Sequence, residues 1–301
     1  MRDLSPLNKL PKVDVYAKGL KDRIPPISNA DTKVRPIIYM HGIFGKADEK
    51  NFACQYIPSV VPGAVVYALD MFNGAESALN LDYQLEYIMP AMQKIMDNHT
   101  DTGVTLLCYS QGGVICRGVV QMLSTHNVHT FITLSSPLDG QYGVTSYMSP
   151  FIPNKDRRYL WEFWYSGVGQ EISIGDYWND PHHQEAFSDP KTDVLIARLN
   201  NQTGHPNKYK KNFLKLERLV MIGGPDDTVI TPWQSAQLGF YNQNETVLPF
   251  EKQPWYSSDE FGLRTLNEAN KVVRHTVAGV NHIYWYRNQK VFDCCVLPYI
   301  S

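Results

Sequence analysis

The chain has 301 residues, of which 43% are hydrophobic and 19% charged, and its formal net charge is −2. A chain of this length can bury a large core, and near-neutral charge without a Lys/Arg stripe argues against nucleic acid as a partner. No apolar run reaches the roughly 18 residues of a membrane span, and the first residues lack the apolar stretch of a signal peptide. The oligomeric state stays open.

Apolar runs alternate with helical patterns along most of the chain. Residues 1–34 are polar and interrupted by prolines, so we interpret them as an N-terminal extension of the main domain, 35–301. Strands separated by helices predict right-handed crossovers, and therefore an α/β fold with a mostly parallel sheet and helices on both faces. The expected strands are 35–42, 63–72, 104–109, 125–137, 216–227 and 271–279, and the expected helices are about 80–97, 112–123 and 288–298.

One long segment, about 137–216, does not follow this alternation. It is rich in aromatic residues, proline and glycine. A loop of that length without structure of its own is improbable inside a compact domain. We therefore predict a cap inserted after the fourth strand.

The stretch Tyr109-Ser110-Gln111-Gly112 joins an expected strand directly to an expected helix. A strand–turn–helix elbow would lift the Ser110 hydroxyl above the sheet and place a helix N-terminus beneath it. Gly112 supplies the small residue that such an elbow requires, whereas Cys108 stands where the G-x-S-x-G pattern has its first glycine. Ser110 is therefore a candidate nucleophile, with helix capping as the alternative.

Candidate partners for this serine follow two later strands, in the chain order nucleophile, acid, base. Asp227 follows the fifth strand and is the candidate acid, with Asp226 as the alternative and a turn-forming role open for both. His282 follows the sixth strand and is the candidate base. Two N–H donors should hold the developing oxyanion, and we expect them at Gln111 and at Ile43 after the first strand.

Other chemistry has weaker support. His182 and His183 suggest a metal pair, but adjacent side chains diverge and matched carboxylates are missing, so we predict no metal and no cofactor. No phosphate-binding glycine motif follows any strand. Three sequons are candidate N-glycosylation sites, although about two would arise by chance in this composition: Asn98, Asn201 and Asn244.

Eight strings together resemble the palmitoyl-protein thioesterases, and most closely their lysosomal branch: HGIF, LDMF, CYSQGGVICR, ITLSSPLDGQYG, YWNDPHH, GGPDDTVITPWQS, GFY…NETVL and AGVNH. The resemblance covers residues 35–301. It implies an α/β-hydrolase fold, a lysosomal location, and hydrolysis of long-chain fatty acyl thioesters such as acyl-CoA, S-acylated small thiols or S-palmitoylated peptides. By position it assigns the nucleophile, acid, base and oxyanion donors to Ser110, Asp227, His282, Ile43 and Gln111.

An acyl chain needs an apolar groove. Cap aromatics are candidates to line it, with packing inside the cap as the alternative for each: Phe151, Trp161 and Phe163. The alternative activities are those of a lipase or carboxylesterase on oxygen esters, and of an inactive lipid-binding protein with the same fold.

The five cysteines include an odd one. Cys108 and Cys116 bracket the elbow, and the resemblance implies a disulfide between them. The pairing of the others stays open: Cys54, Cys294 and Cys295.

Two disulfides that the resemblance implies cannot form here, because the first lacks both cysteines and the second lacks one. Trp164 and Gly175 stand at the positions of the family's cap pair, and His275 stands where the partner of Cys295 would be. This predicts a cap that is either looser or held by aromatic packing.

Overall fold

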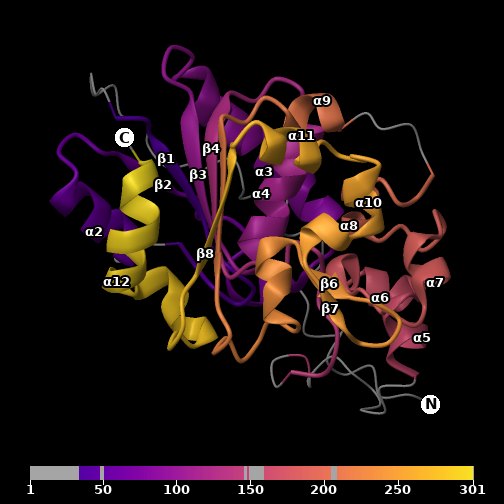
Figure 1. Ribbon diagram of the computed structural model, residues 1–301. Coiled ribbons are helices and arrows are strands. Elements are labelled where there is room, and N and C mark those ends of the chain that lie inside the picture. The colour runs from indigo at the N-terminus through magenta and orange to yellow at the C-terminus, as the bar shows by residue number, and fades with distance from the viewer. Residues whose placement is uncertain (1–33, 48–50, 146–147, 149–158, 205–208, 301) are drawn as a thin grey trace.

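The computed structural model describes residues 34–47, 51–145, 148, 159–204 and 209–300 (Figure 1). The expected N-terminal extension, apart from Val34, and the groove candidate Phe151 lie outside these residues.

A single parallel sheet forms the centre of the molecule, so the predicted α/β fold is confirmed. Its six strands have the order β2-β1-β3-β4-β5-β8, and every neighbouring pair is parallel. Each expected strand is present; β3 has the predicted bounds, and the other five are shorter than the apolar runs that predicted them. The strands are β1 (Ile37–Met40), β2 (Val66–Ala68), β3 (Val104–Tyr109), β4 (Val128–Leu134), β5 (Arg218–Gly223) and β8 (Val272–Thr276).

Both faces of the sheet are covered, which explains why its central strands are nearly continuous apolar runs. Along β1, Ile38 and Met40 belong to one buried cluster, whereas Ile37 and Tyr39 belong to the cluster on the opposite face. Alternation of side chains along the strand produces this division. The two clusters hold the strand ends in place from both sides.

Helices divide between the two faces (Figure 1). The first cluster includes side chains of α3 and α4, and the second includes side chains of α2 and the C-terminal segment. The single closing helix expected at 288–298 is replaced by consecutive short helical turns. The elements are α2 (Phe52–Val60), η3 (Gly74–Ala78), α3 (Leu81–Asp97), α4 (Gln111–Met122), η9 (His282–Arg287), α12 (Gln289–Val291), η10 (Phe292–Val296) and η11 (Leu297–Tyr299).

In its described part, the segment between β4 and β5 contains short helices that pack on the main core. Trp164 and Trp178 are fully buried and stacked, with ring centroids 5.7 Å apart, and both belong to the cluster that contains Leu106 of β3. Aromatic packing therefore occurs at Trp164, a position where the family resemblance implies a cysteine. The elements are α5 (Leu160–Trp164), α6 (Gly167–Gln170), η6 (Gly175–Tyr177), α7 (Gln184–Ser188), α8 (Leu195–Leu199) and α9 (Lys210–Phe213).

A second excursion, between β5 and β8, was not predicted from the sequence. Its elements are two to six residues long, too short for an apolar period to be visible. They are η7 (Trp233–Gln237), β6 (Phe240–Tyr241), β7 (Val247–Leu248), η8 (Phe250–Lys252), α10 (Pro254–Ser257) and α11 (Leu263–Glu268).

A buried polar network ties α4 to the segment after β4. The guanidinium of Arg117 donates to the Leu138 carbonyl (2.6 Å) and to Oδ1 of Asn200 (2.7 Å). Nδ2 of Asn200 in turn donates to Oδ1 of Asp139 (2.7 Å). Burial raises the pKa of the Asp139 carboxyl to about 7, so this acid keeps its proton at mildly acidic pH.

The structure contains two disulfides among the described residues. One joins Cys108 at the end of β3 to Cys116 in α4, and the other joins the neighbours Cys294 and Cys295. Cys54 belongs to neither disulfide. Where the family resemblance implies a disulfide from the last strand to the C-terminal segment, Nε2 of His275 lies 2.9 Å from the hydroxyl of Tyr299.

Candidate active site

Ser110 occupies a strained turn between β3 and α4, with φ 53° and ψ −127°. Positive φ at a residue other than glycine costs energy, and such residues cluster at functional sites. Two glycines make room for the turn. A Cβ on Gly112 would lie 2.6 Å from the Met40 carbonyl oxygen, and one on Gly42 would lie 2.8 Å from Cβ of Ser110. Cys108, which stands at the first glycine position of the G-x-S-x-G pattern, fits because the disulfide directs its side chain to Cys116 in α4.

Three side chains from distant parts of the chain meet at the carboxyl end of the sheet. Oγ of Ser110 lies 2.9 Å from Nε2 of His282, and Nδ1 of His282 lies 2.7 Å from Oδ2 of Asp227. Ser110 follows β3, Asp227 follows β5 and His282 follows β8, so the parallel sheet brings them to one edge. The Asp226 carboxylate, weighed as the alternative acid, instead accepts from the amide of Gly279 (2.6 Å).

The Asp227 carboxylate is fully engaged. Oδ1 accepts from the amides of Val229 (2.9 Å) and Ile230 (2.8 Å), and Oδ2 accepts from Ser135 Oγ and from Trp285 Nε1 (2.8 Å) as well as from His282. Burial acts to raise the pKa of Asp227, but these donors and the imidazole together hold it below its ordinary value. The group is therefore an anion held in one orientation.

Sequence reasoning missed Ser135 and Trp285. Ser135 directly follows β4, and its position at the carboxyl end of a strand could have indicated a role in the site. Trp285 lies one helical turn after His282. Neither residue type is itself a marker of catalysis.

Tyr109 holds the imidazole from the other side. Its hydroxyl donates to the His282 carbonyl oxygen (2.9 Å), and its ring lies 5.3 Å from the imidazole, measured between ring centroids. The residue directly before the serine thus fixes the backbone that carries the histidine. This contact joins β3 to the start of η9.

The loop after β1 lies next to the serine, and side chains brace it. Nδ1 of His41 lies 2.8 Å from the Gly42 carbonyl oxygen, and Nε2 lies 3.0 Å from that of Met71. Burial lowers the pKa of His41, which favours the neutral ring. The amide of Phe44 donates to Oγ of Ser77 (2.7 Å), which secures the loop on η3.

Ser77 also anchors the start of α4. Nε2 of Gln111 donates to the carbonyl oxygen of Ser77 (2.6 Å), and Oε1 accepts from the hydroxyl of Tyr177 (3.2 Å). Within the described part of the chain, neither the amide of Ile43 nor that of Gln111 donates a hydrogen bond. Both amides are therefore available to a ligand beside Ser110.

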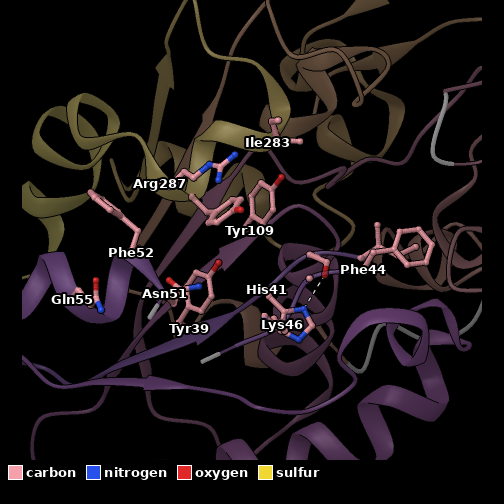
Figure 2. Close-up of a pocket in the computed structure, with 14 residues that line it drawn as sticks. Tyr39, His41, Phe44, Lys46, Asn51, Phe52, Gln55, Tyr109, Ile283 and Arg287 are labelled. Carbon is pink, nitrogen blue, oxygen red and sulfur yellow. Dashed lines mark hydrogen bonds between the residues drawn. The ribbon is translucent and has the colours of Figure 1, made fainter. Parts of the chain in front are cut away.

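A cavity of about 810 Å³ lies beside the triad (Figure 2). Its volume is typical of small-molecule sites. Apolar and cationic groups share its wall, and Figure 2 shows the cationic Arg287 and the aromatic Tyr109 among the side chains that line it. Trp161 and Phe163 do not line it, so their role in an acyl groove stays a prediction. The lining residues are Tyr39, His41, Gly42, Ile43, Phe44, Gly45, Lys46, Asn51, Phe52, Gln55, Tyr109, Ile283, Tyr286 and Arg287.

The remaining candidates lie away from this site. Nε2 of His182 lies 3.0 Å from Oε1 of Glu245, whereas Nδ1 of His183 lies 3.2 Å from Oδ2 of Asp180, so the adjacent imidazoles point to different carboxylates. No group of three potential metal ligands gathers among the described residues. Of the sequons, those at Asn98 and Asn244 are exposed, and the Asn201 amide donates to Glu260 (2.6 Å).

The parallel sheet, the serine elbow after β3 and the Ser–His–Asp geometry together define an α/β hydrolase. The family model described as "Palmitoyl protein thioesterase" matches residues 36–282. The chain belongs to this family. It is a thioester hydrolase that acts on fatty acyl thioesters.

Similar proteins agree with this assignment. The chain is 44% identical to lysosomal thioesterase PPT2 of Rattus norvegicus, over 89% of this chain and 88% of that protein. It is 43% identical to lysosomal thioesterase PPT2 of Homo sapiens over the same shares. It is 38% identical to the lysosomal thioesterase PPT2 homolog of Drosophila melanogaster, over 89% of this chain and 92% of that protein. Among the described residues, no helix is long and apolar enough to span a bilayer.

Proposed function

We propose that Ser110 is the nucleophile of this thioesterase and that His282 and Asp227 are its base and acid. The observation that carries the proposal is the unbroken chain of contacts from the hydroxyl to the carboxylate, 2.9 Å and then 2.7 Å. These distances fit one tautomer, in which Oγ–H donates to Nε2 and Nδ1–H donates to Oδ2. That tautomer leaves Nε2 able to take the proton of the serine.

The reaction has two halves. As the hydroxyl proton moves to Nε2 of His282, Oγ of Ser110 bonds to the thioester carbonyl carbon and the carbonyl electrons move to oxygen. The tetrahedral intermediate collapses with rupture of the C–S bond, and the thiol leaves with the proton from the imidazolium. A water then attacks the acyl-Ser110 ester, gives its proton to His282, and the acid is released as Oγ recovers that proton.

The amides of Ile43 and Gln111 are the proposed donors to the oxyanion. Ser77 holds the chain next to both amides, through the amide of Phe44 and the side chain of Gln111. Neither proposed donor makes a hydrogen bond among the described residues. Preorganised donors of this kind are each worth about 3 kcal/mol of barrier. The variant Gln111→Ala tests this proposal, because the Gln111 side chain anchors the start of α4 that carries the amide. Its loss should lower kcat with little effect on KM.

We propose long-chain acyl thioesters of small thiols, such as acyl-CoA, as the preferred substrates, and S-palmitoylated peptides as a second group. The test compares kcat/KM on a long-chain acyl-CoA with that on the oxygen ester of the same chain. A higher value on the thioester supports the proposal. A higher value on the oxygen ester would instead favour the esterase or lipase alternative. Turnover of neither ester would favour the inactive lipid-binding alternative.

For the acyl chain we propose a groove beneath the segment 137–216, which would act as the cap. Trp161 and Phe163 remain the candidates in its described part, and Ile283 beside the triad is the competing position. Burial of each methylene contributes about 0.8 kcal/mol, or roughly fourfold in binding. A side chain that lines the groove, changed to Ala, should therefore flatten the dependence of kcat/KM on chain length, and a side chain outside it should not.

We propose a lysosomal location. The names of the similar animal proteins support it. Expression in animal cells with endoglycosidase digestion and organelle fractionation tests it. An unglycosylated protein in the cytosolic fraction would contradict it.

A further inference from the structure

We propose that Trp285 and Ser135 are positioning residues that hold the Asp227 carboxylate in the orientation required by His282. The inference rests on the proposed function, because it concerns the acid of the proposed triad. It adds a second layer of side chains, contributed by β4 and η9, to the three residues of the site.

The first support is the crowding of donors on one atom. Oδ2 of Asp227 accepts from Nδ1 of His282 (2.7 Å), from Nε1 of Trp285 (2.8 Å) and from Oγ of Ser135. The two amides on Oδ1 occupy the other oxygen. A carboxylate has about four acceptor sites, so rotation away from His282 would break several bonds at once.

The second support is the placement of both donors. Trp285 is fully buried in the cluster beneath the sheet, and its ring edge would lie 3.3 Å from a Cβ on Gly224, directly before the turn that carries Asp227. Ser135 is also buried and has a φ of 43°, while its amide donates to the Ile222 carbonyl of β5 (2.7 Å). A strained backbone at a non-glycine residue persists only where its surroundings hold it. Here the strained turn presents the hydroxyl to the carboxylate.

The consequence for catalysis is a matter of charge. When His282 accepts the serine proton, the negative charge on Oδ2 stabilises the imidazolium, and the two extra donors share that charge. The titratable neighbour that contacts the pair is Tyr109 from β3. Beyond it lie Tyr39 from β1 and Tyr286 and Arg287 from η9. The Ser135 hydroxyl is one of the donors that lower the pKa of Asp227, and the indole N–H of Trp285 favours the ionised carboxylate in the same way. Without either donor, the Asp227 carboxyl would be protonated at higher pH and would be less well fixed.

The experiment uses Trp285→Phe and Ser135→Ala in the full chain. Trp164→Phe is the matched control, because Trp164 is equally buried and its Nε1 has no partner among the described residues. The readouts are kcat and KM on a long-chain acyl thioester, the rate of fluorophosphonate labelling of Ser110 from pH 4 to 8, and the melting temperature.

We expect each test variant to lose about ten- to a hundredfold in kcat, because a misplaced carboxylate orients the imidazole less well and a misplacement approaching 1 Å can cost about a hundredfold in rate. KM should stay within about twofold. The acid limb of the labelling profile should move to higher pH, because the Asp227 carboxyl loses a donor that favours its ionised form. Trp164→Phe should lower the melting temperature and leave the acid limb unchanged.

Unchanged kcat and an unchanged acid limb in both Trp285→Phe and Ser135→Ala would overturn the inference. If Trp285→Phe does not fold, Ser135→Ala decides alone, because it removes a single oxygen atom. Failure of the proposed function is distinguishable. It would appear as absence of labelling at Ser110 in the unmodified protein, whereas failure of this inference would leave that labelling intact.

Discussion

Gly112 is under a tight steric constraint from the backbone, and Gly112→Ala is a sharp test of the elbow. The added methyl carbon would lie 2.6 Å from the Met40 carbonyl oxygen and closer still to that of His41. Both obstacles are backbone at the end of β1, so neither can rotate away. The start of α4, or the end of β1, must move by several tenths of an ångström.

Such overpacking typically costs about 1–3 kcal/mol of folding stability. The effect on activity should be larger, because the displaced residues carry Ser110 and both proposed oxyanion donors. A misplacement approaching 1 Å can cost about a hundredfold in rate. We expect kcat/KM on a long-chain acyl thioester to fall by about that factor while the protein still folds.

Gly167→Ala is the matched control. A Cβ there meets nothing within 4 Å, and the residue begins the helix α6. The assays are thermal unfolding and steady-state kinetics on both variants. If Gly112→Ala unfolds at the temperature of the unmodified protein and keeps its kcat/KM, the elbow argument is refuted.

Three further predictions concern the acid, the pH dependence of stability and the disulfide. Asp227→Asn should lower kcat by about 10⁴, because the amide favours the wrong imidazole tautomer, whereas Asp226→Asn should lower kcat far less; equal losses in steady-state kinetics would contradict this assignment. Because the folded Asp139 carboxyl keeps its proton to about pH 7 and the unfolded one releases it near pH 4, the folded state binds the extra proton between these values. That contribution to stability is present at acid pH and lost as pH rises through 7, so the difference in melting temperature between the unmodified protein and Asp139→Asn should fall from pH 4 to pH 8; a constant difference would count against it. Replacing Cys108 and Cys116 together by Ser should lower the free energy of unfolding in urea by about 2–3 kcal/mol, as expected for a short closed loop, and an unchanged midpoint would show that the bond contributes nothing.

The sequence predicted the sheet well because buried parallel strands leave a strong signal. All six apolar runs became strands, and polar residues at their carboxyl ends marked the site. The ends of the apolar runs did not predict the ends of the strands, because an apolar residue just outside a strand can be buried as well as one inside it. For example, the run at 125–137 became β4, Val128–Leu134.

What the sequence could not give was set by contacts between distant residues. Ser135 and Trp285 act on Asp227 from 92 and 58 positions away. The cavity wall combines residues of β1, α2, β3 and η9, which are distant in the sequence. No local pattern could therefore predict this wall, and the prediction of groove residues rested on the aromatic content of the segment 137–216. Residue type could not separate Asp226 from Asp227, and the choice of Asp227 rested on its position and on the family resemblance. In the structure, the directions of the two side chains separate them.

The family resemblance supplied what local patterns could not. It led to the expectation of a disulfide between Cys108 and Cys116, which the structure contains. It also identified Trp164 and His275 as departures from the family. In the structure these two positions carry a stacked indole and a hydrogen bond to Tyr299.

The most direct test of the central claim is capture of the acyl-enzyme. The protein is mixed with a long-chain acyl thioester, quenched in acid within one turnover, digested and analysed by mass spectrometry. We predict that the acyl mass appears on the peptide that contains Ser110, and that Ser110→Ala shows neither the adduct nor hydrolysis. An adduct on another residue, or hydrolysis by Ser110→Ala at the rate of the unmodified protein, would contradict the account.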